Sequence, residues 1–418
     1  MAAPDLTKIE PDLVHPQTYV DFGYPHDTWT RLRRESPVAW VERPAGESFW
    51  AITKHADITE IGKNPELFIS SPTLFIPFED EPEGAERFEA PPTLIAMDPP
   101  EHHKQRQIIN KRFTPRALKK IHGDIDRIAK KIVDDLLAEG DEGSIDFVDR
   151  VAAPLPIAVI AWLLGVPESD WNLIFDWTNR TIGAGDPEYQ KEGEDAAATS
   201  NAAMIDLFGY FSKLVEEKRA KPADDLITLF TQAEVDGKKL DPMQILSWCF
   251  IIVIAGNETT RNGTSGGMLA LIQHQDQLRK LQADPSLMKP TIEEMLRWTS
   301  PIIHFARTAT ADTEIRGQKI LEGQRVGLFY GSANRDEEVF DRPFEFDVTR
   351  SPNRHLAFGI GEHFCAGAHV ARLEMEMAFK YLAPRIEEIE LTGPPERLYS
   401  ALVGGVKHLP IRYKLKPA

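Results

Sequence analysis

One cysteine in a glycine-rich segment is the residue of this chain best suited to bind a metal ion or act as a nucleophile. Cys365 lies in the sequence FGIGEHFCAG, residues 358–367, directly before a helical pattern over residues 368–381. Glycine permits positive φ angles and close backbone approach, and the free amides at a helix N-terminus lower the pKa of a cysteine placed there. The segment therefore predicts a stabilised thiolate.

The cysteine by itself leaves several interpretations open. An isolated cysteine in a glycine-rich turn is by default a buried, inert side chain, and a catalytic nucleophile is a further alternative. His363, Cys365 and His369 are close enough in sequence to suggest a zinc site. Zinc sites, however, usually contain cysteines spaced two to four residues apart, and the chain has no such pair.

A second unusual segment, AGNETT at residues 255–260, lies inside a long apolar helical pattern. Glycine and β-branched residues weaken a helix interior, so a compensating role is expected here. The Thr259 hydroxyl can bond back to the carbonyl of Ala255 and open the helix, which leaves room for a small molecule or water. The simpler alternative is that both threonines only bond back to the helix and that Glu258 faces water.

Charged residues recur at helical spacing in two further places. Glu294 and Arg297 are three residues apart and therefore neighbours on a helix face, although exposed pairs of this kind contribute little to stability. His102 and Arg106 are four residues apart on another predicted helix face. From Lys104 to Lys120 there are seven Lys or Arg residues and no Asp or Glu, and a solvated basic face is the usual explanation.

Apolar periodicity predicts the elements that must position these residues. Residues recurring three and four apart indicate helices, and rough alternation indicates a few short strands, so we predict one domain over residues 1–418, mainly α with small β-sheets. Two connections, 70–100 and 183–194, are candidates for a pocket rim and a mobile segment. The predicted helices are 121–137, 171–182, 202–218 and 243–274, and the predicted strands are 38–40, 49–52, 324–329 and 406–413.

Composition narrows the class of protein. The 418 residues are 42% hydrophobic and 27% charged, with a net charge of -17, which argues against binding to nucleic acid. Two cysteines, Cys249 and Cys365, provide no disulfide framework and indicate a reducing compartment. The longest apolar stretches fall short of the roughly 20 residues needed to span a bilayer, and the N-terminus has no targeting pattern. We therefore expect a cytoplasmic protein with no membrane or nucleic-acid partner.

Residues 358–367 resemble the ligand loop of the cytochrome P-450 family at every specified position: Phe, two residues, Gly, three residues, Cys, one residue, Gly. The resemblance covers essentially the whole chain, with the motifs in the same order. It implies a single-domain, triangular cytochrome P-450 fold and a haem b cofactor (iron protoporphyrin IX). It also implies that Cys365 is the axial iron ligand. A thiolate in that position favours cleavage of the O–O bond.

The same resemblance implies roles for other residues. Thr259 would hydrogen-bond dioxygen and Glu258 would help to relay protons, a type of assistance that speeds proton transfer roughly 10²–10⁴-fold. A buried ion network of Glu294, Arg297 and Arg350 would support the ligand loop. The residues implied to hold the haem, mostly through its propionates, are His102, Arg106, Arg307, Phe358, Gly359 and His363.

The function implied by the resemblance is that of a monooxygenase using O2 and two electrons. An iron–sulfur ferredoxin, supplied by a ferredoxin reductase, would dock by complementary charge at Lys104, Lys111, Arg112 and Arg116. The alternative within the same resemblance is a non-catalytic haem sensor or carrier.

The residues expected around the substrate are apolar and include no Arg or Lys. We therefore predict an uncharged terpenoid, steroid or alkyl-aromatic substrate. The expected substrate contacts are Ile95, Ile251, Ile254, Ala255, Ile303 and Phe305, with Phe75, Leu402 and Val403 as further candidates at the rim and at the tip of a glycine-rich hairpin, 401–406.

Overall fold

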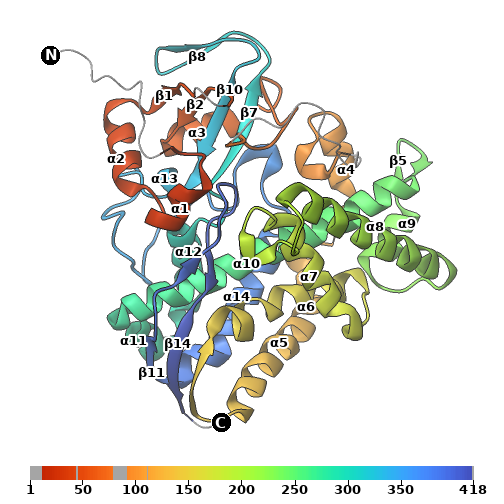
Figure 1. Ribbon diagram of the computed structural model, residues 1–418, viewed down its shortest axis with the longest axis vertical. Helices are drawn as coiled ribbons and strands as arrows, with labels where there is room; N and C mark the ends of the chain where they lie inside the picture. Colours follow the sequence, from red (N-terminus) through yellow and green to blue (C-terminus); the bar gives the residue numbers. More distant parts are fainter. Residues whose placement is uncertain (1–11, 44–45, 79–91, 111, 417–418) are drawn as a thin grey trace.

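The computed structural model describes residues 12–43, 46–78, 92–110 and 112–416. Helices dominate and the sheets are small, which confirms the predicted mainly α class (Figure 1). Among the described residues, no helix combines the length and the apolar character needed to cross a bilayer. The helices are α1 Pro16–Phe22, α2 His26–Glu35, α3 His55–Gly62, α4 Glu101–Asn110, α5 Pro115–Ala138, α6 Pro154–Leu164, α7 Trp171–Ile182, α8 Ala196–Ala220, α9 Leu226–Gln232, α10 Pro242–Gln273, α11 Gln275–Ala283, α12 Met288–Thr299, α13 Tyr330–Ala333 and α14 Ala368–Leu382.

The four predicted helices are confirmed, with α7 beginning and ending at the predicted residues. Helices α5, α8 and α10 begin before the first residue of the predicted apolar pattern. The reason is that a polar N-cap residue, rather than an apolar residue, starts each of them. The Thr114 side chain accepts a hydrogen bond from the amide of Ala117 ahead of α5. Asp241 and Gln244 form a capping box at the start of α10.

Helix α10 crosses the middle of the molecule and joins its two largest apolar cores (Figure 1). Its first half, with Trp248 and Val253, packs in one core, and its last turns, with Met268 and Leu271, pack in the other. The stretch between them is buried but polar. Because buried polar groups are costly without partners, this stretch requires specific contacts. Its buried polar residues are Asn257, Glu258, Thr260, Arg261, Asn262, Thr264 and Ser265.

The largest sheet has the strand order β1-β2-β10-β7-β3. Strand β10 pairs parallel with β2 and antiparallel with β7, in a register that places Arg307 opposite Val326. The predicted strands at 38–40, 49–52 and 324–329 are confirmed, whereas β7 was missed because its sequence, HFARTA, lacks a clear alternation. The strands are β1 Val38–Val41, β2 Phe49–Ile52, β3 Phe68–Ile69, β4 Glu142–Asp146, β5 Glu234–Val235, β6 Lys238–Lys239, β7 His304–Ala309, β8 Thr313–Ile315, β9 Gln318–Ile320, β10 Arg325–Phe329, β11 Ile386–Leu391, β12 Glu396–Arg397, β13 Val406–His408 and β14 Pro410–Leu415.

The prediction of one strand over 406–413 is wrong, because the chain changes sheets at Leu409. Strand β13 pairs with β12, whereas β14 lies between β11 and β4. Leu409 is fully buried, and its carbonyl accepts a hydrogen bond from the amide of Phe147 at 2.9 Å. A continuous strand would lose this anchor.

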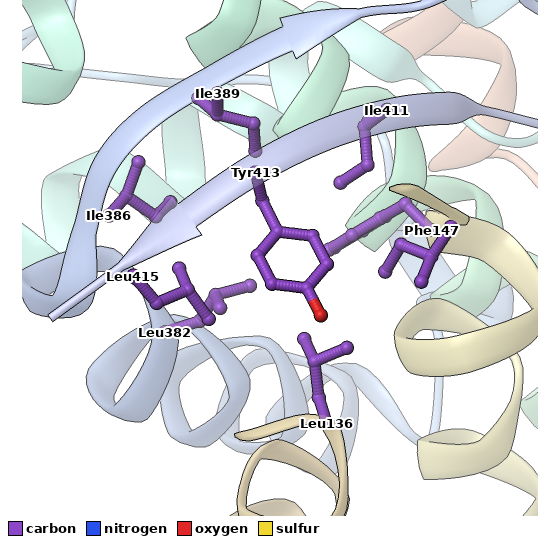
Figure 2. A pocket seen from close by; sticks show the side chains of 9 residues that line it. Leu136, Phe147, Leu382, Ile386, Ile389, Ile411, Tyr413 and Leu415 are labelled. Atoms are coloured by element: carbon purple, nitrogen blue, oxygen red, sulfur yellow. The ribbon is translucent and has the colours of Figure 1, made fainter. Parts of the chain in front are cut away.

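The β11-β14-β4 sheet packs its apolar face against α5 and α14. Figure 2 shows Tyr413 of β14 surrounded by apolar side chains, among them Leu136 of α5 and Leu382 of α14. The cavity left between them is about 10 Å³, about the size of one water molecule, and its lining is apolar. This is a packing defect in a core and not a ligand site.

The connection 183–194, predicted as a mobile candidate, is tied to the β12–β13 hairpin. Asp186 is buried, accepts a hydrogen bond from the amide of Tyr399 at 3.0 Å and pairs with Lys407 at 2.9 Å. Glu188, in the short 3-10 helix η4 Pro187–Tyr189, lies 2.8 Å from His408. Of the predicted rim loop 70–100, residues 79–91 lie outside the described part, and the remainder contains the 3-10 helix η1 Leu94–Ala96.

Candidate active site

The loop that carries Cys365 is fixed by its own backbone and by α3. The amide of Cys365 donates to the carbonyl of Phe358 at 2.9 Å. Gly359 and Gly361 have φ angles of 69° and 76°, which favour glycine. A Cβ atom on Gly361 would lie 1.8 Å from the carbonyl oxygen of Gly62 at the end of α3, so no other residue fits there.

The electrostatic environment of Cys365 differs from the prediction. Burial raises the pKa of the thiol, and the amides of Gly367 and Ala368 together with the guanidinium groups of Arg106 and Arg372 oppose this effect only in part. The predicted low pKa is therefore wrong for the thiol alone, because loss of hydration outweighs the helix N-terminus. A coordinated metal ion deprotonates a thiol directly, so ligation can supply what the helix does not.

The structure brings together the four basic residues predicted to hold haem propionates. His363 lies in η6, Gly361–His363, and its ring centroid is 4.2 Å from that of His102 on α4. Arg106, one turn further along α4, donates to the carbonyl of Phe364 at 2.6 Å. Burial, and then the positive charges of Arg307, His102 and Arg106, lower the pKa of His363 to about 3. These residues therefore share one electrostatic environment.

Arg307 supplies the strongest indication of what this cluster holds. Its side chain is only 6% exposed, and it donates to the carbonyl of Ala306 at 2.7 Å but pairs with no acidic residue in the described chain. The neighbouring acids are engaged elsewhere, Glu362 with His102 at 3.1 Å and Asp98 with the amides of Ser70 and Ser71. A buried guanidinium without a counter-charge is costly, so a ligand that carries carboxylates fits this position.

One face of the mostly buried α10 is accessible. Ala255 is exposed, and Ile251, Ile254 and Thr259 are half-buried. Residues 251, 255 and 259 are four apart and form one stripe along the helix. As predicted, the Thr259 hydroxyl donates to the carbonyl of Ala255, at 2.8 Å. The stripe thus combines an apolar surface with one hydroxyl group.

Glu258 does not face water, so that alternative is wrong. It is 2% exposed and forms an ion pair with Arg261, three residues further along α10. Asn262 also donates to its carboxylate, at 3.2 Å. The sequence reasoning did not single out Arg261, although the spacing of opposite charges inside an apolar pattern was a usable signal.

The predicted buried network of Glu294, Arg297 and Arg350 is confirmed. Glu294 and Arg297 are both fully buried and form two hydrogen bonds of 2.7 and 2.8 Å. Arg350 donates to the same carboxylate at 3.1 and 3.2 Å. Arg297 also donates to the carbonyls of Asn334 and Pro343, which ties α12 to the segment that leads to the cysteine loop.

A second ionic link, missed in the sequence, joins α12 and α14 to the start of the cysteine loop. Glu293 accepts two hydrogen bonds from Arg372 of α14, at 2.6 and 2.8 Å, and lies 3.0 Å from His355. The Arg372 guanidinium stacks 4.4 Å above the ring of Phe358. Arg372 thus positions Phe358, whose carbonyl holds the Cys365 amide.

The predicted substrate contacts are distributed unevenly. Ile95 in η1 and Phe305 in β7 are half-buried, whereas Ile303 is fully buried in a core with Trp29 and Phe329. The hairpin tip lies against this segment, because the amide of Ile303 donates to the carbonyl of Leu402 at 2.9 Å. Of the further candidates, Phe75 is exposed, Leu402 is half-buried and Val403 is buried.

The basic stretch from Lys104 to Lys120 is partly neutralised by one acid next to it in sequence and by two that are distant. Lys104 pairs with Glu101 and with Asp236, at 3.0 and 2.8 Å, and Arg112 pairs with Asp224. Lys111 lies outside the described residues. Arg116, Lys119 and Lys120 on α5 are exposed, and Lys119 borders a surface groove of about 390 Å³ between α5, α12 and α14.

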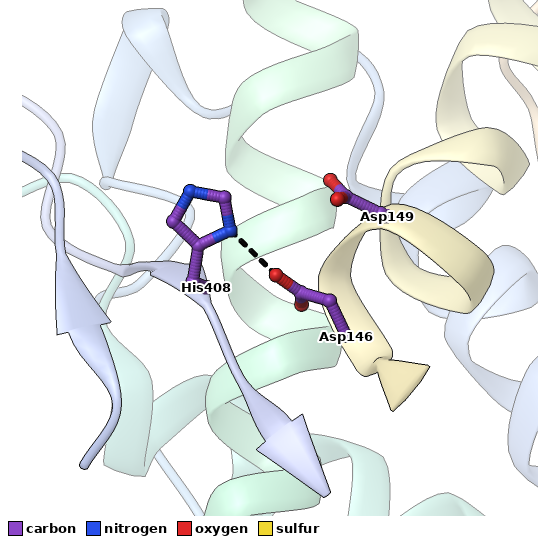
Figure 3. Close-up of side chains that lie close together, drawn as sticks. All are labelled: Asp146, Asp149 and His408. Atoms are coloured by element: carbon purple, nitrogen blue, oxygen red, sulfur yellow. Dashed lines mark hydrogen bonds and ion pairs between the residues drawn. The ribbon is translucent and has the colours of Figure 1, made fainter. Parts of the chain in front are cut away.

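A zinc site at Cys365 is not supported by the arrangement of side chains. His369 is exposed on α14, and within the part of the chain that the structure describes no group of three potential ligands includes Cys365. The three-ligand groups that do occur share His408, on the other side of α10. Figure 3 shows His408 with Asp146 and Asp149.

Comparisons with known proteins agree with this geometry. The cytochrome P-450 family matches residues 194–382 of the chain. The methyl-branched lipid omega-hydroxylase of Mycobacterium tuberculosis is 37% identical over 91% of this chain and 89% of its own. A steroid C26-monooxygenase of the same species is 37% identical over 96% and 92%. Cytochrome P-450-terp of a Pseudomonas species is 36% identical over 96% of each chain.

Solved structures match across nearly the whole length. A cytochrome P-450 of Mycobacterium marinum in complex with pseudoionone has a TM-score of 0.88 and 34% identity, and the match covers 96% of this chain and 97% of that one. Cytochrome P-450-153 from Novosphingobium aromaticivorans has a TM-score of 0.85 and 31% identity, over 97% and 99%.

The Glu293 link predicts a specific acid sensitivity. Burial alone would raise the pKa of Glu293, but hydrogen bonds from His355 and Arg372 lower it from 4.5 to about 2. The link therefore stabilises the fold above about pH 4.5, and this contribution is lost as the pH falls towards 2. In Glu293→Gln the loss of stability between pH 5 and 3, measured by urea unfolding, should be smaller by about 1–2 kcal/mol.

The matched control is Glu388→Gln, which changes an exposed carboxylate on β11. It should follow the parent protein at each pH. An identical pH dependence for Glu293→Gln and the parent would contradict the stabilising role of the link.

Proposed function

This chain belongs to the cytochrome P-450 family and is a haem-dependent monooxygenase, and we propose that it hydroxylates a hydrophobic, uncharged small molecule with Cys365 as the iron ligand. Bound haem supplies the activation of O2, with one oxygen atom going to the substrate and the other leaving as water. The observation that carries the proposal is the buried Arg307, which has no acidic partner in the described part of the chain, beside His102, Arg106 and His363 at the edge of the Cys365 loop.

The side chains of α10 have two proposed roles, proton handling and contact with the substrate. We assign proton handling to Thr259 and Glu258, since reduction of oxygen to water consumes protons and positioned acid–base groups speed such transfers roughly 10²–10⁴-fold. The position of Thr259 supports this role, because its side chain lies on the accessible stripe and its hydroxyl donates to the Ala255 carbonyl. Ile251, Ile254 and Ala255 would exclude water and contact the substrate.

Replacement of the ligand tests the iron assignment. In Cys365→Ser the thiolate-specific Soret shift of the reduced carbon monoxide adduct should disappear and turnover should fall below detection, because a serine hydroxyl does not replace a thiolate. Cys249→Ser is the control, since Cys249 is fully buried within an apolar core. A Cys365→Ser protein that kept the thiolate spectrum would end the assignment.

The substrate class follows from the character of the accessible stripe. The predicted contacts that remain accessible are Ile95, Ile251, Ile254, Ala255 and Phe305, and none is charged. Relatives are named for action on methyl-branched lipids and steroids, and a matching structure holds pseudoionone. We therefore propose a neutral terpenoid, steroid or alkyl-aromatic substrate.

Binding spectra test this class directly. Ligands that displace water from the iron change its spin state, so steroids, terpenoids, alkyl-aromatics and small aromatic acids can be compared in one titration series. Neutral ligands should give spin-state changes at concentrations at least about tenfold below those of matched carboxylic acids, a difference of about 1.4 kcal/mol. Tighter binding of the acids would exclude the proposed class.

We further propose that an iron–sulfur ferredoxin delivers the electrons in the cytoplasm, docking near α4 and α5. The support is local and electrostatic, because Arg116, Lys119 and Lys120 are exposed on α5. Lys119 also borders the groove between α5, α12 and α14, and α14 is the helix that follows Cys365. Lys104 and Arg112 contribute less free charge, because both are paired with acids of the chain.

Charge reversal tests the docking surface. Among Lys104→Glu, Lys111→Glu, Arg112→Glu and Arg116→Glu, the last should reduce ferredoxin-dependent turnover most at low ionic strength, because Arg116 is exposed and forms no ion pair within the described chain. Reduction by dithionite should be unchanged. Arg31→Glu, on the exposed face of α2, is the control. Unchanged ferredoxin-dependent turnover in all four variants would exclude this surface.

A further inference from the structure

Arg261 connects Glu258 to two other segments of the molecule. Its guanidinium pairs with Glu258 on one side and donates to the side-chain carbonyl of Asn179, near the end of α7, at 3.0 Å. Tyr189 in η4 interacts electrostatically with Arg261. Arg261 and Glu258 are each only 2% exposed. One buried cation thus joins the proposed proton-handling carboxylate to α7 and η4.

The segment at η4 is itself held in place by ionic contacts. Glu188 pairs with Lys407 at 2.9 Å and lies 2.8 Å from His408, both on β13. His408 also pairs with Asp146, and Figure 3 shows this pair beside α10. A series of contacts therefore runs from β13 through η4 and Arg261 to Glu258. The step between η4 and Arg261 is the electrostatic interaction of Tyr189 with the guanidinium, so displacing η4 would change the surroundings of the Glu258 pair.

The surroundings of the pair contain polar atoms without partners. Both polar side-chain atoms of Asn257, the Nε of Arg261 and the Oδ1 of Asn262 are buried and unpaired within the described residues. Such atoms are rare in folded proteins and usually indicate bound water or an alternative arrangement. The ion pair can therefore exchange partners locally without carrying its charges into an apolar core.

Removing Arg261 alone would leave a buried carboxylate without its counter-charge, which is strongly unfavourable. Positions 258 and 262 lie on one side of the stripe of Ala255 and Thr259, and 261 lies further around the helix on the same side. The pair with Arg261 therefore draws the Glu258 carboxylate towards α7 and away from the stripe. The Arg261 pKa is raised because Glu258 and Tyr189 outweigh the opposing effect of burial.

We propose that Arg261 is a positioning residue that keeps the Glu258 carboxylate turned towards α7, and that its hydrogen bond to Asn179 and its electrostatic interaction with Tyr189 make this orientation depend on the positions of α7 and η4. The inference rests on the proposed function, in which Glu258 and Thr259 handle protons. Displacement of α7 or η4 would weaken the ion pair of Arg261 with Glu258 and let the carboxylate turn towards Ala255 and Thr259. The positions of α7 and η4 would then control when protons are supplied.

Infrared spectroscopy of the resting, haem-loaded protein tests the effect of Arg261 on the Glu258 carboxyl group without turnover. In Arg261→Gln, Glu258 should take up a proton at neutral pH and show the carbonyl stretch of a protonated carboxyl group. The band should be absent from the parent, from Arg261→Lys, which keeps the positive charge, and from the double variant Arg261→Gln/Glu258→Gln. Absence of the band in Arg261→Gln would overturn the proposal.

Stability measurements keep the test decisive if Arg261→Gln folds poorly. The double variant should then unfold at a higher temperature than Arg261→Gln, because it removes a buried carboxyl group that must otherwise take up a proton or stay charged without a partner. A double variant no more stable than the single one would contradict the positioning of Glu258 by Arg261.

Asn179→Ala and Tyr189→Phe test the links to α7 and η4. Each should increase the share of consumed electrons lost as peroxide, and no change in both would overturn the dependence on these segments.

Glu258→Gln separates this inference from the proposed function. If Glu258→Gln turns over like the parent while the carboxyl band appears in Arg261→Gln, the proton role of Glu258 fails but the positioning by Arg261 stands. If Glu258→Gln loses activity on the order of 10²-fold and the band does not appear, the function stands and the inference fails.

Discussion

Buried and half-buried arginines, each held by several acceptors, are the constraint on which this structure depends. Arg297, fully buried, joins α12 to the segment ahead of the cysteine loop through Glu294 and backbone carbonyls. Arg372 links α12 and α14 to Phe358, and Arg261 links α10 to α7. Each guanidinium needs several acceptors in fixed directions, so each permits one arrangement of the elements around it. The loop that holds Cys365 is therefore positioned by charges rather than by apolar packing alone.

The same reasoning explains why Arg307 differs from the other three. Arg261, Arg297 and Arg372 are matched by carboxylates of the chain, whereas Arg307 is buried without an acidic partner among the residues that the structure describes. A folded protein tolerates such a charge when a ligand neutralises it. If haem carboxylates bind Arg307 as proposed, part of the binding free energy offsets a cost already present in the folded protein.

Sequence reasoning succeeded where the signal was local. The helix 171–182 was correct in both bounds, and the back-bond of Thr259 followed from its spacing to Ala255. It failed where the outcome depended on residues distant in the chain. The acids that neutralise Lys104 and Arg112 are Asp236 and Asp224, more than a hundred residues away. The split at Leu409 depends on Phe147, and the thiol environment of Cys365 depends on burial that no motif reports.

The glycine pair at the hairpin tip has a consequence for engineering. A Cβ atom on Gly405 would lie 2.1 Å from the side chain of Asn262, and one on Gly404 would lie 2.5 Å from the hydroxyl of Tyr24. A side chain at 405 would push the tip away from α10, and one at 404 would push it away from Tyr24. Directed evolution of substrate preference through this loop is therefore confined to residues 401–403, and grafted tips from related enzymes must keep both glycines to leave the catalytic helix undisturbed.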